Sequence, residues 1–378
     1  MKGYYISTVS NNYQETSKSG VYKKVNAQIK AISKYFEITQ NIHNTSNIKN
    51  SIVHRIKRRL PLIVVTKKWI FYDYYKTADF FYFRKELLDK SLFTLFCKIK
   101  KENPKCKVLL EIPTYPYDRE IVHGFREILN LPLLLKDIYN RNKLHKYIDR
   151  IITYTEDINI FGIPTIVVKN GIDFSTIPIR NISSNTSTIS VIAVASISFW
   201  HGYDRFITGM GEYYKNNGKR NIVFHIVGIG APVSKYKKIV SNYNIERHII
   251  FHGCKIGKDL DDIYDIAAVG IDTLGSHRKG LERSSSLKSR EYAAKGLPII
   301  TSINIDIFDI DSPYIYIVPA DDSNVDIADF IKFYDSLYNG SQNAVEIAED
   351  IRKRAFEKSD INIVMQPIID YLMDHVTK

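Results

Sequence analysis

The segment from His277 to Ser302 holds the densest set of side chains that could do chemistry. Three consecutive serines, at 284–286, are suited to cap a helix, because a hydroxyl accepts a hydrogen bond from the free amides of the first turn. Gly296 and Pro298 then end the helix, and two isoleucines begin a short strand. The pattern therefore predicts a polar loop, a short helix and a buried strand.

A helix start is a natural anion site, because its amides are free and the positive end of the helix dipole lies there. Cationic and hydroxyl side chains accompany this one: His277, Arg278, Lys279, Ser285, Ser286 and Lys288. Glu291 comes roughly 9 Å further along the axis at ~1.5 Å per residue, about the span from a diphosphate to the ribose of one nucleotide. A carboxylate there would accept hydrogen bonds from the ribose hydroxyls. The alternative is a surface helix with buried alanines and a solvated glutamate.

The same stretch resembles the donor site of GT-B glycosyltransferases of the family 4 type. Those enzymes carry a loop, a helix with a ribose-binding glutamate and an Ala-x-Gly-x-Pro strand entry. The matching residues here are Ser285-Ser286-Leu287-Lys288, Glu291 and Ala294-Lys295-Gly296-Leu297-Pro298. One departure is plain, since the family often has an earlier second glutamate and Arg283 stands at that position.

The loop around 196–202 extends the resemblance. Related enzymes hold an Arg and a Lys there that grip the donor diphosphate, and those places fall on or near Ser196 and His201. The run 200–204 resembles a sub-branch found among capsule and exopolysaccharide enzymes. By the same resemblance Gly20, Gly202 and Gly228 belong to the donor side. A protonated His201 would assist, and its titration would then shape the pH dependence of turnover between about pH 5.5 and 7.5.

Composition bounds the class of protein. The 378 residues are 44% hydrophobic, which suits two globular domains. No run of about 18 apolar residues is present, so no spanning helix is expected. The start of the chain has no signal-peptide pattern, and the three cysteines are scattered, which is typical of reduced cytosolic thiols without a metal site. The formal net charge of +12 suits an anionic membrane or a phosphorylated substrate, and no nucleic-acid-binding motif accompanies it.

In the N-terminal half, polar residues follow predicted strands. A strand over 78–84 delivers Arg84 to its carboxyl end, and a strand that begins at 107 exits into an aromatic loop. Open α/β sheets bind ligands at the carboxyl ends of their strands. The candidate acceptor-binding residues are therefore Arg84, Glu111, Tyr115, Tyr117 and Asp118. The alternative is a loop made rigid by its two prolines.

The stretch 54–72 mixes basic and aromatic residues. Lys and Arg are attracted to anionic lipid, and Trp and Tyr favour the membrane interface. This stretch is a candidate membrane contact, although an ordinary amphipathic helix followed by a strand explains it equally well.

Three further patterns complete the chain. Residues 150–173 predict a strand, a short helix and a strand that end in an Asn-Gly turn at 170, where the domain boundary is placed. Gly228 and Gly230 form only half of a dinucleotide fingerprint, which gives little support to NAD binding. The Asp309-Ile310-Asp311 run is formally a DxD motif, but its place in a late loop argues against a metal site.

Repeated alternation of strands and helices predicts an α/β protein with parallel sheets. The resemblance implies a GT-B architecture of two Rossmann-like domains that face each other across a cleft. Residues 1–169 would bind the acceptor, residues 170–355 would bind the donor, and a final helix over 356–378 would cross back.

The function implied is transfer of a sugar from a nucleotide-sugar, with retention and without metal or other cofactor. The expected acceptor is a lipid-linked saccharide of bacterial surface polysaccharide synthesis, at the cytoplasmic face of the membrane. The expected catalytic residues are Glu291, Lys288, Arg278 and His201. Two alternatives stay open at this point: a nucleotide-sugar epimerase of the same fold, and a non-catalytic sugar-binding or scaffold protein.

Overall fold

The computed structural model describes residues 1–7, 20–42, 69–122, 130–181, 187–280, 283–340 and 343–374. The basic part of the candidate membrane contact, residues 54–68, lies outside them. The chain divides into two compact units. Unit 1 comprises Met1–Lys169 and Val364–Lys378, and unit 2 comprises Asn170–Ile363. Within the described ranges, no helix is long and apolar enough to cross a membrane.

Unit 1 is built on a seven-stranded sheet with the strand order β2-β1-β3-β4-β5-β7-β6. Its strands are β1 (Lys2–Ser7), β2 (Glu37–Ile42), β3 (Phe80–Arg84), β4 (Lys107–Ile112), β5 (Arg150–Thr153), β6 (Asn159–Ile160) and β7 (Ile163–Val167). The pairs are parallel except for β6 with β7. The central strands are apolar runs, as expected where both faces of a parallel sheet are covered.

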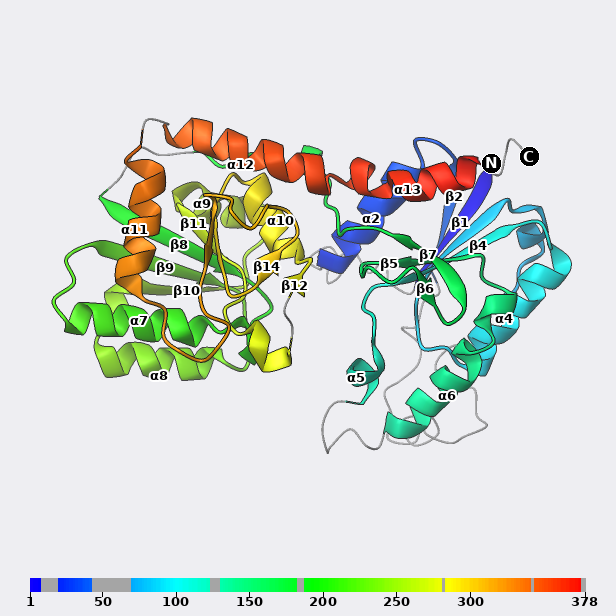
Figure 1. The fold of residues 1–378 in the computed structure, drawn as a ribbon, viewed down its shortest axis with the longest axis horizontal. Coiled ribbons are helices and arrows are strands. Elements are labelled where there is room, and N and C mark those ends of the chain that lie inside the picture. The colour runs from blue at the N-terminus through cyan, green and yellow to red at the C-terminus, as the bar shows by residue number, and fades with distance from the viewer. Residues whose placement is uncertain are drawn as a thin grey trace. The chain divides into compact units, whose positions relative to one another are not determined.

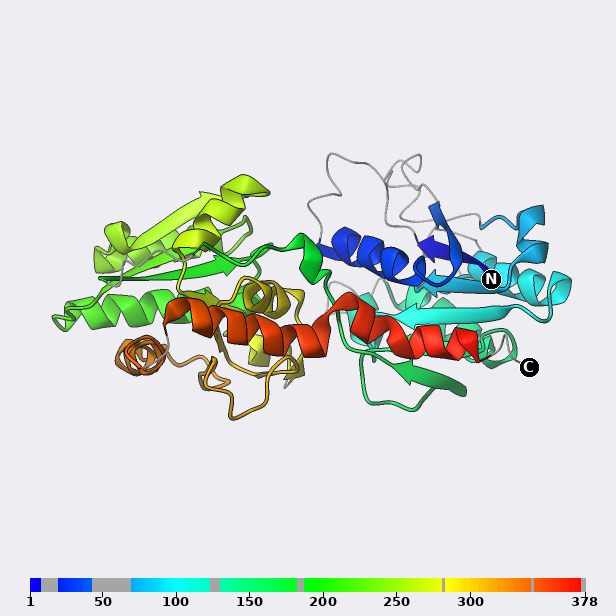
Figure 2. The ribbon, with the colours of Figure 1, turned by 90° about the horizontal axis from the view of Figure 1, so that it is seen from above.

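Helices cover both faces of this sheet (Figures 1 and 2). On one side lie α2 (Gly20–Ile32) and α13 (Ile361–Met373), which joins unit 1 from Val364 onward. On the other side α4 (Lys90–Glu102) inserts Leu92, Phe96 and Ile99 into the core. The remaining elements are short α5 (Asp118–Ile121), α6 (Leu131–Arg141), and the 3₁₀ turns η1 (Asp73–Thr77) and η3 (Leu144–Lys146).

The segment 150–173 differs from its prediction. The two predicted strands are present as β5 and β7, but in place of the short helix β6 pairs with β7 as an antiparallel hairpin. Phe161 and Gly162 connect them, and both have positive φ angles, of 55° and 79°. A two-residue connection of this kind matches the twist of the strands on either side, so the turn residues favoured a hairpin over a helix.

Unit 2 has a six-stranded, fully parallel sheet with the order β10-β9-β8-β11-β13-β15. Its strands are β8 (Thr188–Val194), β9 (Asn221–Val227), β10 (Ile249–Gly253), β11 (Val269–Ile271), β13 (Ile299–Thr301) and β15 (Ile315–Ile317). A separate parallel pair joins β12 (Arg283–Ser284) to β14 (Asn304–Ile305).

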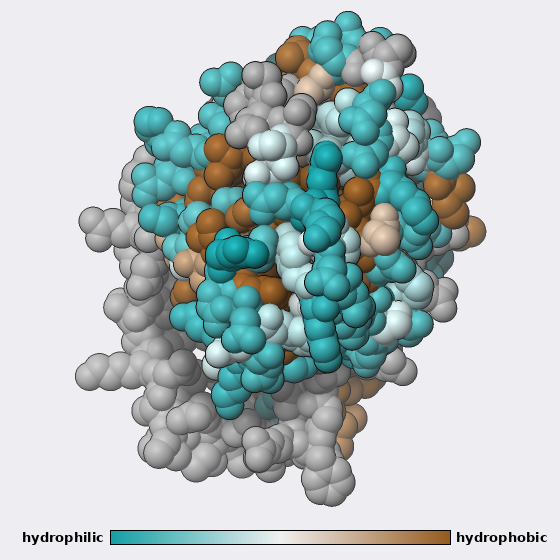
Figure 3. All heavy atoms as spheres, turned by 90° about the vertical axis from the view of Figure 1, so that its left-hand side faces the viewer, coloured by the Kyte–Doolittle hydropathy of each residue, from teal (hydrophilic) through white to brown (hydrophobic). Residues whose placement is uncertain are grey.

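Two apolar clusters sandwich the sheet of unit 2 (Figure 1). One face packs on α7 (Tyr203–Lys215), α8 (Val233–Tyr243) and α11 (Ile327–Tyr338). The other packs on α9 (Lys258–Ile266), α10 (Leu287–Ala294) and α12 (Ala344–Ser359). The 3₁₀ turns are η4 (Phe174–Thr176), η5 (Phe199–His201), η6 (Glu246–His248) and η7 (Ser276–Lys279). On the outer face of unit 2 hydrophilic residues dominate, with hydrophobic ones scattered among them (Figure 3). Each unit is thus a mainly parallel sheet between two helical layers, which confirms the predicted α/β class.

Candidate functional site

The loops that follow β8 and β11 touch each other in unit 2. The backbone N–H of Leu274 donates to the carbonyl of His201 at 2.9 Å. Gly202 has a φ of 66°, and a Cβ on it would lie 2.5 Å from the backbone nitrogen of Gly275. Only glycine permits so close an approach. The contact brings the predicted residues of the 196–202 loop next to those of 277–279.

Asp272 is the buried carboxylate at this place. It directly follows β11 and is 1% exposed. The Ser289 hydroxyl donates to it at 2.6 Å and the Ser286 hydroxyl at 3.2 Å, and Lys288 Nζ lies 3.0 Å from its Oδ1. Burial alone would raise the pKa of Asp272, but the Lys288 charge and these hydrogen bonds outweigh it and hold the pKa below its usual value. Asp272 therefore stays ionised and fixes the start of α10.

The predicted cap is Ser286, whose hydroxyl accepts from the backbone N–H groups of Lys288 at 3.1 Å and Ser289 at 3.5 Å. Lys288 turns toward the strand end, where its Nζ donates to the Asp272 carbonyl and to the Thr273 hydroxyl, each at 3.0 Å. The side chain is 21% exposed, so a cation is held at the helix start in a half-buried position.

Ser285 belongs to a second network. Its hydroxyl donates to Asp306 at 2.8 Å and accepts from the Asn170 N–H at 3.2 Å and from Arg290 at 3.0 Å. The fully buried Arg290 also pairs with Asp306 at 2.7 Å and donates to the carbonyls of Asn170 and of Ser286. These contacts clamp the first residue of unit 2 onto the loop before α10.

Arg278 reaches from η7 into the 196–202 loop. Its guanidinium donates to both carboxylate oxygens of Asp204, at 3.1 and 3.3 Å, and to the Phe199 carbonyl at 2.7 Å. Its Nε donates to Asp322 at 2.7 Å. The two carboxylates outweigh the effect of burial and raise the pKa of Arg278, which stays charged. A cation from the neighbouring loop thus borders the loop in which the resemblance expects an arginine of its own.

The other basic residues of η7 lie beside it. Lys279 Nζ is 3.6 Å from the centre of the Trp200 ring, a cation–π contact. His277 Nε2 lies 3.1 Å from Asp322 Oδ1. Burial lowers the pKa of His201 most, and the charges of Lys288 and Lys279 lower it further. Both charges therefore act on η5. Arg278 and Lys279 therefore contact one short turn, η5, and the charge of Lys288 acts on the histidine of that turn.

His201 corrects the expectation about pH. Its ring is largely buried and stacks on Tyr203, with centroids 5.4 Å apart. Its Nδ1 accepts from the Ser198 N–H at 2.9 Å as part of a capping box. Burial, and then the Lys288 charge, lower the pKa of His201 to about 3. The ring is neutral between pH 5.5 and 7.5, so it cannot supply positive charge or a titration in that range.

The remaining donor-side predictions occupy defined places. Leu287 is the first residue of α10, and Glu291 lies half-buried one turn later, where its charge helps burial to raise the pKa of Tyr264. Gly228 directly follows β9, and a Cβ there would lie 1.8 Å from the Ala195 carbonyl oxygen, so a close backbone approach explains this glycine. Gly20 is the exposed first residue of α2 in unit 1.

Unit 1 holds its own buried carboxylate, Glu111, near the carboxyl end of β4. Tyr82 donates to it at 2.9 Å, Tyr154 at 2.8 Å and Gln28 Nε2 at 3.2 Å. Burial, with the Glu111 charge, raises the pKa of both tyrosines, so both remain protonated donors. Glu111 and its three donors come from four elements: Gln28 from α2, Tyr82 from β3, Glu111 from β4 and Tyr154 from the loop after β5.

Two cations complete this network. Arg84 Nη1 lies 2.6 Å from Glu111 and Lys24 Nζ lies 3.4 Å from it. Burial would raise the pKa of Glu111, but Lys24 and Arg84 more than offset this and lower it to about 2. Lys24 and Arg84 therefore both pair with Glu111 at the carboxyl edge of the sheet.

The other acceptor-side predictions are bound into a neighbouring cluster. Tyr117 donates to the buried Asp137 at 2.5 Å, and Asp118 pairs bidentately with Arg141, at 2.5 and 3.1 Å. Tyr115 packs edge-on against Phe161 at 5.8 Å. These contacts hold the loop after β4 in place. Of the acceptor-side predictions, the structure joins only Arg84 and Glu111 to the Glu111 network.

Sequence analysis missed several residues of both networks. Asp272, Asp204, Lys24, Gln28, Tyr82 and Tyr154 were not singled out. The position of Asp272 directly after an apolar strand was a usable signal. For the others the partner lies far along the chain, and no local pattern marks it.

Neither the DxD run nor any other described group forms a metal cluster. Asp309 pairs with Lys358 at 2.7 Å. Among the described residues, no three His, Cys, Asp or Glu side chains are close enough to hold a metal ion.

No family model and no curated protein sequence matches this chain. Solved structures do resemble it. A glycosyltransferase from Rickettsia africae superimposes with a TM-score of 0.62 at 12% identity, over 100% of this chain and 99% of that one. Sucrose-phosphate synthase from Thermosynechococcus elongatus gives 0.63 at 13% identity, over 99% of both chains. HepE from Anabaena, in complex with UDP and glucose, gives 0.59 at 10% identity, over 99% of this chain and 100% of that one.

This chain has the GT-B fold. The likeness extends over the full length of both partners in each pair, so it includes both units. At such low identity it establishes the architecture, while the chemistry has to be argued from the side chains. The resemblance seen in the sequence is thus confirmed for the fold.

Proposed function

We propose that this protein transfers a sugar from a nucleotide-sugar to a saccharide acceptor. The observation that supports this most is that Arg278 and Lys279 contact η5, while the charge of Lys288 acts on the same turn from the start of α10. A leaving diphosphate gains negative charge as the glycosidic bond breaks, and cations held ready for it are usually the largest catalytic contribution. UDP-sugars are the first donors to test, because HepE, of the same fold, was crystallised with UDP and glucose.

We also propose, from the family 4 resemblance, that transfer retains the anomeric configuration and uses no metal or other cofactor. In this proposal the nucleotide-sugar is a substrate, and Lys288 with Arg278 and Lys279 takes the role that a metal ion has elsewhere. Each of the three cations would exchange part of its present contact for a diphosphate oxygen.

The acceptor side belongs to unit 1 in this proposal. The position of two cations, Lys24 and Arg84, at the carboxyl edge of the sheet supports an acceptor that carries phosphate. A lipid-linked saccharide of surface polysaccharide synthesis, such as capsule or exopolysaccharide, has this chemistry. We therefore place the reaction at the cytoplasmic face of a bacterial membrane, with the enzyme peripheral to it.

The test is incubation with a panel of UDP- and GDP-sugars, with and without phosphate-bearing saccharide acceptors. Acceptor-dependent nucleotide release, together with a mass increase of one sugar on the acceptor, is the expected result. An inverted sugar centre without an acceptor would identify an epimerase, and binding without turnover would identify a sugar-binding protein. Donor at 100-fold over its dissociation constant should add ~2.7 kcal/mol to the stability, which a thermal-shift screen detects.

Glu291 gives the sharpest single variant. If its carboxylate binds the donor ribose, Glu291→Ala should lower kcat/KM at least ~10-fold, on the order of the 1.5–3 kcal/mol of a hydrogen bond to a charged group. Glu349→Ala, on the exposed side of α12, is the matched control and should leave kcat/KM unchanged. Equal kinetics of the Glu291 variant and wild type would remove Glu291 from the site.

A further inference from the structure

Helix α6 of unit 1 exposes three of its apolar side chains and buries two of its polar ones, together with Leu133. Leu131, Leu135 and Tyr139 are 44%, 57% and 65% exposed, whereas Asp137 and Asn140 are 0% and 6% exposed. Residues four apart lie above one another at ~3.6 residues per turn, so the three apolar side chains form one line, which we call the α6 stripe. Buried polar residues and lined-up exposed apolar ones are the informative exceptions to ordinary burial.

The buried polar side chains hold the helix in this orientation. Asp137 accepts from the Leu88 N–H at 3.0 Å and from the Tyr117 hydroxyl at 2.5 Å. Asn140 donates back to the Leu88 carbonyl at 2.8 Å. Rolling α6 to bury its stripe would break all three bonds and leave buried polar groups unpaired. The stripe is therefore held outward by the fold itself.

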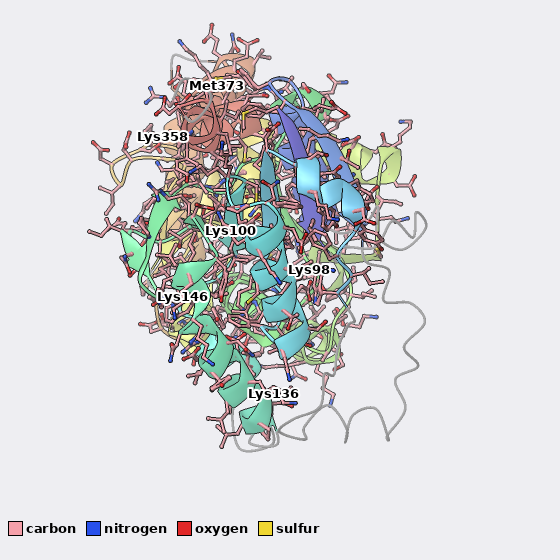
Figure 4. All side chains as sticks on the ribbon, turned by 90° about the vertical axis from the view of Figure 1, so that its right-hand side faces the viewer. Lys98, Lys100, Lys136, Lys146, Lys358 and Met373 are labelled. Carbon is pink, nitrogen blue, oxygen red and sulfur yellow. The ribbon has the colours of Figure 1, made fainter. Side chains whose placement is uncertain are left out.

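Basic residues surround the α6 stripe. Lys143 Nζ lies 3.5 Å from the centre of the Tyr139 ring, and Lys143, with Lys90, lowers the pKa of Tyr139. Lys136 on α6 and Lys146 on η3 lie on the side of unit 1 that also carries Lys98 of α4 (Figure 4). An apolar line with a tyrosine and flanking lysines is the composition of a helix that lies in a lipid interface.

We infer that the α6 stripe docks unit 1 onto an anionic lipid surface. The leucines would enter the boundary between headgroups and acyl chains, Tyr139 would lie at headgroup level, and the lysines would meet lipid phosphates. One helix face is small for a stable protein interface, which needs ~800 Å² per partner. A membrane needs no matching surface, and the net charge of +12 adds attraction to it. This inference does not depend on the proposed sugar transfer.

Flotation with vesicles tests it. The vesicles are phosphatidylcholine alone, or phosphatidylcholine with about one third phosphatidylglycerol as the anionic lipid. Wild type should float with the anionic vesicles and much less with the neutral ones. Leu135→Ser/Tyr139→Ser should lower the partition coefficient at least ~10-fold, because binding scales with the apolar area inserted. Ile266→Ser, at a 50% exposed position on α9 of unit 2, is the matched control and should float like wild type.

A charge variant tests the second half of the inference. Lys136→Glu/Lys143→Glu should lose binding to anionic vesicles, and added salt should weaken wild-type binding, since screening shortens the reach of exposed charges. Lys219→Glu/Lys238→Glu, with the same charge change on exposed residues of unit 2, should bind more tightly than the first pair.

Two results would overturn the inference. One is flotation of the Leu135/Tyr139 variant equal to wild type, with circular dichroism showing both folded. The other is absence of vesicle binding together with a dimer in light scattering that the same variant dissociates, since the stripe would then bind a second copy of this chain.

Discussion

Asp272 and Lys288 form the pair on which the start of α10 depends. Lys288 is the only strong cation among the donors to Asp272 that the structure describes, and the other donors are the two hydroxyls of Ser286 and Ser289. Removing one partner of a buried ion pair leaves an uncompensated charge, which costs more than the pair itself contributes. The two residues should therefore respond differently to single and to paired substitution.

Lys288→Ala should lower the free energy of unfolding by about 3 kcal/mol or somewhat less, because Lys288 keeps partial contact with water. It should also lower turnover at least ~10-fold if Lys288 meets the leaving diphosphate. Urea denaturation and steady-state kinetics measure the two effects. Lys288→Met/Asp272→Asn should regain most of the stability without regaining turnover. Full activity of this double variant would show that Lys288 only stabilises the fold.

His201 should titrate far below neutral pH. Because burial lowers its pKa to about 3, its ring resonances in NMR should not shift between pH 7.5 and 5.5. His201→Asn, which can keep an acceptor for the Ser198 N–H, should leave the shape of the pH–rate profile unchanged. A His201 titration midpoint near 6.5 would contradict the burial seen here.

For single residues, sequence patterns located those whose roles depend on near neighbours in the chain. The serine cap placed Ser286 and Lys288 at a helix start, because capping depends on neighbours two or three residues away. They could not reveal that Arg278 is held by Asp204, since those residues are far apart in the chain and only the contact between two loops joins them. The patterns also did not indicate that the His201 ring is buried, because the burial of a ring depends on the packing of distant elements.

The Glu111 network shows how helices and strands are fixed to each other in unit 1. It joins α2 to β3, β4 and the loop after β5 through hydrogen bonds and two ion pairs. Glu111 is fully buried, so these contacts replace the hydrogen bonds that its carboxylate would accept from water. The packing of α2 therefore depends on charge as well as on apolar contact.

Glu111→Gln should lower the free energy of unfolding of unit 1 by about 3 kcal/mol, because Lys24 and Arg84 would each lose a buried ion pair. Tyr82→Phe removes one donor only and should cost about 1 kcal/mol. Chemical denaturation followed by circular dichroism measures both. Asp73→Asn, which removes the exposed ion pair with Lys76 in the same unit, should leave the stability unchanged. If it cost as much as Glu111→Gln, burial would not be the cause.

Strands and helices were the level at which sequence patterns worked best. Apolar runs followed by polar loops located β3 and β4 of unit 1 and β13 of unit 2, because buried parallel strands have that composition in any context. The strands β2 and β15 were not predicted. The hairpin of β6 and β7 was missed, since a short apolar segment fits a helix or a strand equally well. The turn at Phe161 and Gly162 decided between them.

Among the described residues, the histidines whose pKa values burial lowers lie in one of the two units. The buried or half-buried histidines with lowered pKa values, 201, 225, 248 and 252, all lie in unit 2. For His225 burial lowers the pKa to about 4. Glu111, with its pKa lowered to about 2, lies in unit 1. The units should therefore lose stability in different ranges of pH.

Unit 2 should weaken first on acidification. Its folded histidines stay neutral while unfolded ones bind protons below about pH 6.5, so stability falls as the pH drops from there toward 4. The Glu111 contribution is present above about pH 4.5 and is lost as the pH falls toward 2. Urea unfolding at pH 7.5, 6 and 5 should show two transitions that move apart. His145→Gln, an exposed position in unit 1, is the control. A single transition at every pH would contradict this.

The division of unit 1 into two stretches of chain has a consequence for biosynthesis. Met365, Ile368, Ile369 and Leu372 of α13 are buried, and they are made only after all of unit 2. A ribosome therefore releases every residue of unit 2 before the helix that covers the sheet of unit 1 exists. Domains usually fold in the order of their synthesis, but here the unit that begins first is completed last. Until then the nascent chain has an uncovered apolar face, at which chaperones can bind.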